Sequence, residues 1–174
     1  MKKVVTLILF FISSYVFSTT FLTEQVLKNN RLILNGVGTR KATWFKVEVY
    51  DAALYLAKKT KDPKEIISGD QKIILMKFKR SVSKNKMSST WMNGFKRLGL
   101  DKKLNNQIKT FSTFFSDLKE DDIVQINFDK EKTQVFINNV IKGVISNVDF
   151  TKGLISLWFV KPEDKGLAKQ LRGL

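Results

Sequence analysis

The sequence contains neither cysteine nor histidine. Without thiols the protein has no disulfide framework, no thiolate nucleophile and no cysteine-rich zinc site. Without imidazole it has no Ser-His or Cys-His catalytic pair and no histidine-based metal cluster. Most common hydrolase and metalloenzyme mechanisms are therefore excluded, and we predict no metal and no cofactor. The chemistry that remains is that of Arg, Lys, Tyr, Ser, Thr and carboxylates, or binding without catalysis.

Proline and low-complexity sequence are also scarce. The only prolines are Pro63 and Pro162, and no Gly/Ser-rich or single-residue tract divides the chain. This composition indicates one compact domain, which we expect over residues 19–174. A chain near that length buries roughly 68–70% of its unfolded surface, which is enough to fold without disulfides or metal.

The first residues form a separate segment. Two lysines precede an apolar run from Val4 to Phe17, which is too short for a comfortable membrane span of about 20 apolar residues. Val16 and Ser18 are small enough for the positions before a cleavage site. We therefore predict a signal peptide over residues 1–18, cleaved after Ser18, and a periplasmic or secreted protein. The alternative is an uncleaved N-terminal anchor.

Positive charge is in large excess, with 31 Lys+Arg against 16 Asp+Glu and a net charge of +15. Such an excess often indicates a nucleic-acid partner. Here the charges are scattered as pairs and singles instead of forming one basic block, and predicted export also argues against nucleic acid. We interpret the excess as a solvated lysine-rich surface. A weaker alternative is loose attraction to an anionic membrane surface.

Strands are predicted at both ends of a helical middle. Alternation of apolar and polar residues predicts strands at 31–40, 43–57, 72–79, 124–128, 133–138 and 140–145. Apolar spacings of three and four predict helices at 87–98, 101–118 and 150–158, and prolines suited to a first helical turn predict two more at 62–67 and 162–172. This order indicates an α+β domain, a largely antiparallel sheet with a helical layer on one face. A closed barrel or a doubly wound sheet fits the order less well.

The most distinctive short motif is Gly36-Val37-Gly38-Thr39-Arg40. It does not qualify as a phosphate loop, because no Gly-Lys-Ser/Thr follows and the segment runs from strand to strand. Taken alone, the motif is also consistent with a glycine bulge followed by an exposed arginine.

Together with the segments that follow, this motif resembles the opening hairpin of the chalcone isomerase-like family. The resemblance rests on Leu34 to Arg40, Phe45 to Tyr50 and Ala52 to Leu56. Later segments, including the helix around Trp91 and the one from Phe150 to Trp158, follow the family's order. The resemblance implies an open-faced β-sandwich, in which helices cover a large antiparallel sheet and a ligand cleft lies between them. The family contains plant enzymes that cyclise chalcones, fatty-acid-binding proteins, and an exported bacterial branch without assigned chemistry, which this chain resembles most.

The resemblance also implies candidate site residues. The family's arginine falls on Arg40, whereas Tyr50 lies where the enzymes carry a threonine. Ser83 and Thr90 lie where they carry a tyrosine and an asparagine. An arginine combined with a tyrosine on the strand is the arrangement with which the fatty-acid-binding branch holds a carboxylate. We therefore predict Arg40, Tyr50, Ser83 and Thr90 as ligand-binding residues, with Arg40 as the catalytic candidate if the protein is an enzyme.

Three functions stay open at this point. The first is non-catalytic binding of a small apolar acid, such as a fatty acid, by a monomer. The second is an isomerase or intramolecular lyase that cyclises a chalcone. The third is an interaction module without a ligand, expected if side chains such as Trp91 and Phe95 close the cleft. By strand parity Tyr50 faces solvent like Glu48, unless a bulge near Asp51-Ala52 resets the alternation.

Overall fold

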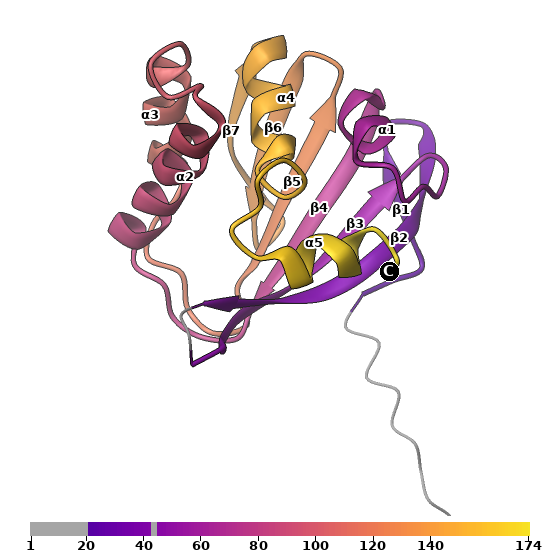
Figure 1. The fold of residues 1–174 in the computed structure, drawn as a ribbon, viewed down its shortest axis with the longest axis horizontal. Helices are drawn as coiled ribbons and strands as arrows, with labels where there is room; N and C mark the ends of the chain where they lie inside the picture. The colour runs from indigo at the N-terminus through magenta and orange to yellow at the C-terminus, as the bar shows by residue number, and fades with distance from the viewer. Residues whose placement is uncertain (1–20, 43–44) are drawn as a thin grey trace, which may run out of the picture.

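The protein folds as one curved antiparallel sheet with helices on one side (Figure 1). The computed structural model describes residues 21–42 and 45–174, so the predicted signal peptide lies outside the described residues. Seven strands follow one another in chain order across the sheet. They are β1 (Glu24–Leu27), β2 (Asn30–Ala42), β3 (Val47–Leu56), β4 (Gln71–Phe78), β5 (Ile123–Asp129), β6 (Lys132–Ile137) and β7 (Val140–Ser146).

Five helices complete the described part of the chain. They are α1 (Pro63–Ser68), α2 (Lys84–Leu98), α3 (Asn105–Thr113), α4 (Val148–Ser156) and α5 (Lys165–Leu171). The predicted α+β class and the helical layer on one face of an antiparallel sheet are confirmed. The predicted end of α2 is also confirmed, because Gly99 adopts a left-handed conformation with φ 72° after the last turn.

Two predicted helices are too long. The helix predicted to run to Leu118 ends at Thr113, because Leu118 instead pairs with Val82 in an isolated bridge, each backbone N–H donating to the other's carbonyl at 2.9 Å. Asp101 does not cap this helix, since its N-cap residue is Leu104, which makes no side-chain cap bond. The last helix begins at Lys165 instead of Pro162, because the Asp164 side chain accepts a hydrogen bond from the Leu167 N–H.

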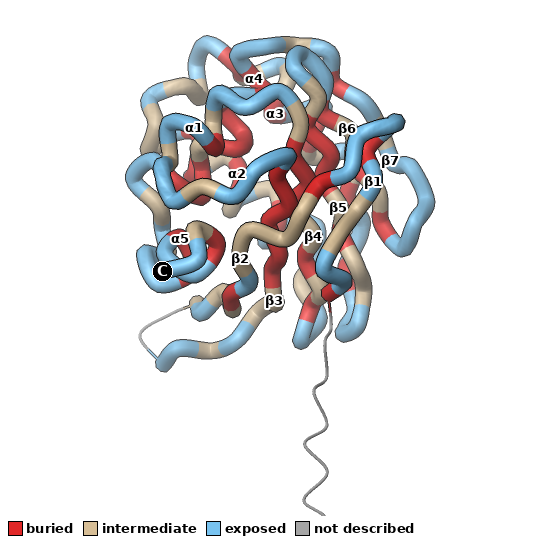
Figure 2. Tube along the Cα trace, turned by 90° about the vertical axis from the view of Figure 1, so that its right-hand side faces the viewer, coloured by how far each residue is buried: buried red, intermediate tan, exposed pale blue. Residues whose placement is uncertain are grey.

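The main core lies between the helices and the sheet. Its largest fully buried side chains include Phe78, Phe95, Phe111, Phe128 and Phe150. Figure 2 shows that buried positions run through the middle of the sheet, while the outer sides of the helices are exposed. Phe95 stacks on Phe150 with ring centroids 5.4 Å apart, so aromatic side chains close much of the space between the layers.

A second, smaller apolar cluster lies on the other face of the sheet. It contains Phe21, Leu27, Leu32, Ala53, Tyr55 and Ile73. Successive strand residues point to opposite faces, which places Tyr55 in this cluster while Leu54 belongs to the main core. The Tyr55 hydroxyl donates to the Leu22 carbonyl at 2.9 Å. Tyr55 is therefore a core residue of the far face and does not line the helix-covered cleft.

No helix within residues 21–42 and 45–174 is long and apolar enough to cross a membrane.

Candidate functional site

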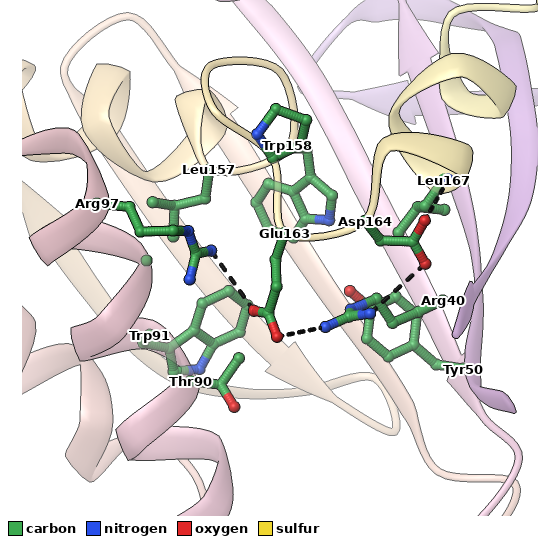
Figure 3. A pocket seen from close by; sticks show the side chains of 12 residues that line it. Arg40, Tyr50, Thr90, Trp91, Arg97, Leu157, Trp158, Glu163, Asp164 and Leu167 are labelled. Carbon is green, nitrogen blue, oxygen red and sulfur yellow. Dashed lines mark hydrogen bonds and ion pairs between the residues drawn. The ribbon is translucent and has the colours of Figure 1, made fainter. Parts of the chain in front are cut away.

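A small cavity lies between the β2–β3 hairpin, α2 and the connection from α4 to α5 (Figure 3). Its volume is about 50 Å³. Its polar lining residues are Arg40, Tyr50, Thr90, Arg97, Glu163 and Asp164, and its apolar walls include Trp91, Leu157, Trp158 and Leu167. Three of the four predicted site residues, Arg40, Tyr50 and Thr90, are thus brought together.

Arg40 occupies the centre of the polar side of this cavity. Its side chain is only 13% exposed, and its Nη2 lies 2.8 Å from Glu163 Oε1. Nη1 lies 3.5 Å from Asp164 Oδ2 and also donates to the Lys41 carbonyl. A guanidinium held this far from water needs anionic partners, and here two carboxylates of the same chain supply them. The motif taken alone was also consistent with an exposed arginine, and that interpretation is wrong.

Tyr50 reaches the same side of the sheet because of a β-bulge. Arg40 pairs with Tyr50 while Lys41 pairs with Glu48, so Val49 is an extra residue in β3. The bulge resets the alternation, and Tyr50 packs on Phe78 of the main core at a ring distance of 5.4 Å. The parity argument that turned Tyr50 to solvent is therefore wrong, although the reset lies at Val49 and not near Asp51-Ala52.

The hydroxyl of Tyr50 is a hydrogen-bond donor over the whole physiological pH range. Burial of this group raises the pKa of Tyr50 to about 12, and the nearby positive charge of Arg40 only partly opposes the shift. Part of the tyrosine surface stays accessible. A neutral phenol beside a guanidinium can donate to an anion that the guanidinium binds.

Asp164 is fixed in place by the backbone. Its Oδ1 accepts from the Leu167 N–H at 3.0 Å, which caps α5, and its Oδ2 accepts from the Lys41 N–H at 2.8 Å. Burial alone raises the pKa of the Asp164 carboxyl, but these two N–H groups and Arg40 together lower it. Asp164 therefore ties the start of α5 to the end of β2 and is a structural part of the site.

Glu163 is held differently from its neighbour. Its side chain is 48% exposed, and its two carboxylate oxygens face two arginines. Oε1 lies 2.8 Å from Arg40 Nη2, and Oε2 lies 3.5 Å from Arg97 Nη2. Figure 3 shows Glu163 between the two guanidinium groups.

The two glycines of the Gly36-Val37-Gly38 motif bring α5 onto this hairpin. A Cβ added at Gly36 would lie 2.2 Å from the Gln170 carbonyl oxygen, and one at Gly38 would lie 2.4 Å from Gln170 Oε1. The predicted bulge is present between Leu34 and Gly36. The physical need for glycine is thus the close approach of a helix backbone, which positions Glu163 and Asp164 over Arg40.

Two buried donors in the cavity wall lack acceptors. Within the described residues, Trp91 Nε1 and Arg97 Nε have no hydrogen-bond partner. Trp91 is 5% exposed and packs edge-on against Trp158 at 5.8 Å. Buried donors normally find an acceptor, so these two groups have free capacity for a ligand or a water molecule.

Thr90 and Ser83 differ in their positions. Thr90 lines the cavity, although its hydroxyl donates to the Lys86 carbonyl of its own helix at 2.8 Å. Ser83 is the N-cap of α2, where its exposed side chain accepts from the Lys86 N–H at 3.3 Å. It does not line the cavity, because α2 carries Thr90 and Trp91 to the site about two turns further on.

The acidic half of the site was not predicted from the sequence. Glu163 and Asp164 are the only acids after Asp149 in a strongly basic chain, and this isolation is the signal that could have marked them as partners for a buried arginine. Arg97 carried no signal beyond its place in the last turn of α2. In the described part of the chain, no cluster of His, Cys, Asp or Glu could hold a metal ion.

The fold resembles that of a solved structure. A fatty-acid binding protein from Arabidopsis thaliana aligns with 81% of this chain and 86% of its own, with a TM-score of 0.66 and 14% sequence identity. No curated protein matches this sequence. The sequence model of the chalcone isomerase-like family matches residues 14–173, so the chain belongs to this family.

Proposed function

We propose that this protein binds a small carboxylic acid with an apolar chain, without catalysing a reaction on it. The observation that carries the proposal is the pairing of the largely buried Arg40 with a half-exposed carboxylate, that of Glu163. A carboxylate is thus the group that this guanidinium binds, and the planar fork of the guanidinium matches the geometry of a carboxylate. The carboxylate of a ligand has the same chemistry.

The neighbouring groups suit the head of such a ligand. Arg40 would donate two hydrogen bonds, and Tyr50 would donate a third because its phenol stays neutral at physiological pH. Trp91, Leu157 and Trp158 form the apolar side of the same cavity. An apolar site with a few convergent polar groups is the usual composition of a small-molecule site.

The cavity is small for an apolar ligand. Ligand sites usually enclose about 300–1,000 Å³, whereas this cavity is about 50 Å³. Binding an apolar chain therefore requires that side chains of the wall move apart. The Arabidopsis structure with the same fold is that of a fatty-acid binding protein, which supports an apolar acid as the ligand class. Export through the N-terminal segment remains part of this proposal.

Native mass spectrometry tests the proposal. The protein is incubated with a lipid extract, and the wild type is compared with Arg40→Ala and Arg40→Lys. We expect a bound acid on the wild type, less on Arg40→Lys because the fork is lost, and none on Arg40→Ala. Arg80→Ala, which removes an exposed arginine, should retain the ligand. No bound acid on any variant, or equal amounts on all, would refute the proposal.

One observation favours a second candidate, the interaction module without a ligand. Phe95 is fully buried and Trp91 nearly so, and Arg40 already has two carboxylate partners. Retained folding with no acid bound to any variant would support this candidate. The geometry adds nothing to the case for an isomerase, since Ser83 lies outside the cavity.

A further inference from the structure

The anion position at this site is defined by two arginines. Arg97 comes from the last turn of α2, and its Nη2 lies 3.5 Å from Glu163 Oε2. Arg40 approaches the other oxygen of the same carboxylate from β2. Two guanidinium groups that converge on one carboxylate from different elements form a preorganised anion site.

Two residues that line the same cavity also carry donors without acceptors. Arg97 Nε and Trp91 Nε1 are buried without acceptors in the described residues. An unpaired buried donor is unfavourable, so a ligand acceptor that reached either donor would add an interaction that the protein alone does not make. Glu163 therefore satisfies the site only in part.

Glu163 is also the partner that can leave. Asp164 accepts from two backbone N–H groups and caps α5, so its displacement would disturb the helix. In the described part of the chain, the ion-pair partners of Glu163 are the two arginines alone, and its side chain is 48% exposed. Water can solvate the half-exposed Glu163 carboxylate once it leaves the arginines, and an incoming carboxylate can take its place as the partner of Arg40.

We infer that the ligand's carboxylate binds in the place now taken by the Glu163 carboxylate, between Arg40 and Arg97, and that Glu163 competes with the ligand. The inference rests on the proposed function and extends it by assigning Arg97 as a second head-group residue. When Glu163 occupies the site, only the fraction of molecules with a displaced Glu163 is competent to bind. The apparent affinity is reduced by that fraction.

Removal of the competitor should strengthen binding. Isothermal titration calorimetry with sodium dodecanoate compares the wild type with Glu163→Gln, and we expect the affinity to rise about fivefold. Glu120→Gln is the matched control, because it makes the same charge change at an exposed residue outside the cavity. The same titration with 1-dodecanol, which lacks the carboxylate, should show no gain.

The role of Arg97 is best measured in the Glu163→Gln background. In that background, loss of Arg97 cannot act by releasing Glu163. We expect Arg97→Met to weaken dodecanoate binding about tenfold, as the loss of a charge-assisted contact does. Arg80→Met in the same background removes an exposed arginine and should leave the affinity unchanged.

The outcomes separate the two proposals. Dodecanoate binding that depends on Arg40 but is unchanged by Glu163→Gln and by Arg97→Met would overturn this inference and leave the proposed function standing. Absence of binding to the wild type and to Glu163→Gln would overturn both. A gain in Glu120→Gln equal to that in Glu163→Gln would reduce the effect to net charge and also overturn the inference.

Discussion

Two buried cations lie at opposite ends of β3 on the helix-covered face of the sheet. Arg40 pairs with Tyr50 at one end, and Lys72 lies opposite Leu56 at the other. Arg40 faces two carboxylates, one of them half exposed. The Lys72 side chain donates to the carbonyls of Ile67 and Gly69 at the end of α1.

This difference separates a candidate binding site from a structural contact. Lys72 is 2% exposed, and its carbonyl partners belong to the backbone and cannot be exchanged for a ligand. Burial lowers the pKa of Lys72 to about 8, with Asp70 opposing the shift. At the other end, Glu163 is a side-chain anion that can be exchanged. A buried cation is thus a sign of anion binding only where its partner is replaceable.

The largest expected effect comes from a comparison of the glycine under α5, Gly36, with the glycine at the end of α1, Gly69. In Gly36→Ala the new methyl would lie 2.2 Å from the Gln170 carbonyl oxygen, so α5 must move off β2. We expect a loss of about 3 kcal/mol in the free energy of unfolding. In Gly69→Ala the nearest atom lies at 3.3 Å and the glycine has φ −57°, so the loss should stay below about 1 kcal/mol. Urea denaturation measures both, and equal losses would contradict the close-approach argument.

The second comparison concerns the caps of two helices. Asp62 caps α1 near Lys72 with one bond to the Lys64 N–H, and its replacement by Ala should cost about 1 kcal/mol. Asp164 caps α5, accepts also from the Lys41 N–H and faces Arg40, so Asp164→Ala should cost about 2–3 kcal/mol. Thermal or urea unfolding of the two variants checks the order. An equal cost would mean that the contacts of Asp164 to β2 contribute nothing.

The third comparison uses pH, because the two ends titrate with opposite sign. Between about pH 8 and the ordinary lysine value of 10.5, the folded protein binds fewer protons at Lys72 than the unfolded chain. The free energy of unfolding should therefore rise by about 2 kcal/mol from pH 8 to pH 10. Lys72→Met should lack this rise, while Lys64→Met, at an exposed position of α1, should keep it.

For Tyr50 we expect the free energy of unfolding to follow the reverse trend at higher pH. Its raised pKa of about 12 means that the folded protein retains a proton that the unfolded chain loses above pH 10. Stability should fall by about 1 kcal/mol between pH 10 and pH 11 from this group. Tyr50→Phe should show a smaller fall than the wild type in the same urea titrations. An unchanged slope would contradict burial of the hydroxyl.

Much of the fold could be predicted from local pattern. The alternation in Ile74, Met76 and Phe78 marks the buried face of β4, and the spacing of Met87, Trp91 and Phe95 marks that of α2. The short strand β1 was missed, because Glu24–Leu27 spans only four residues with no clear alternation. Helix ends were misplaced where a tertiary contact decides them, as in the bridge between Leu118 and Val82.

The site was predictable only in part. Arg40 and Tyr50 came from the family resemblance, because no local signal marks the extra residue Val49 that turns Tyr50 inward. Asp164 lies 124 residues from Arg40 along the chain. A single sequence contains no information on such a distant pairing. Because proline is favoured in the first turn of a helix, the last helix was predicted to begin at Pro162. The capping role of Asp164, two residues later, was therefore not recognised.

Binding as we propose it requires that a ligand carboxylate replace the Glu163 carboxylate at Arg40. A crystal structure of the protein with dodecanoate bound tests this directly. We predict a ligand carboxylate within hydrogen-bonding distance of Arg40 and Arg97, with the Glu163 side chain turned to solvent and Asp164 still capping α5. A dodecanoate bound elsewhere, with Glu163 still paired to Arg40, would contradict the account.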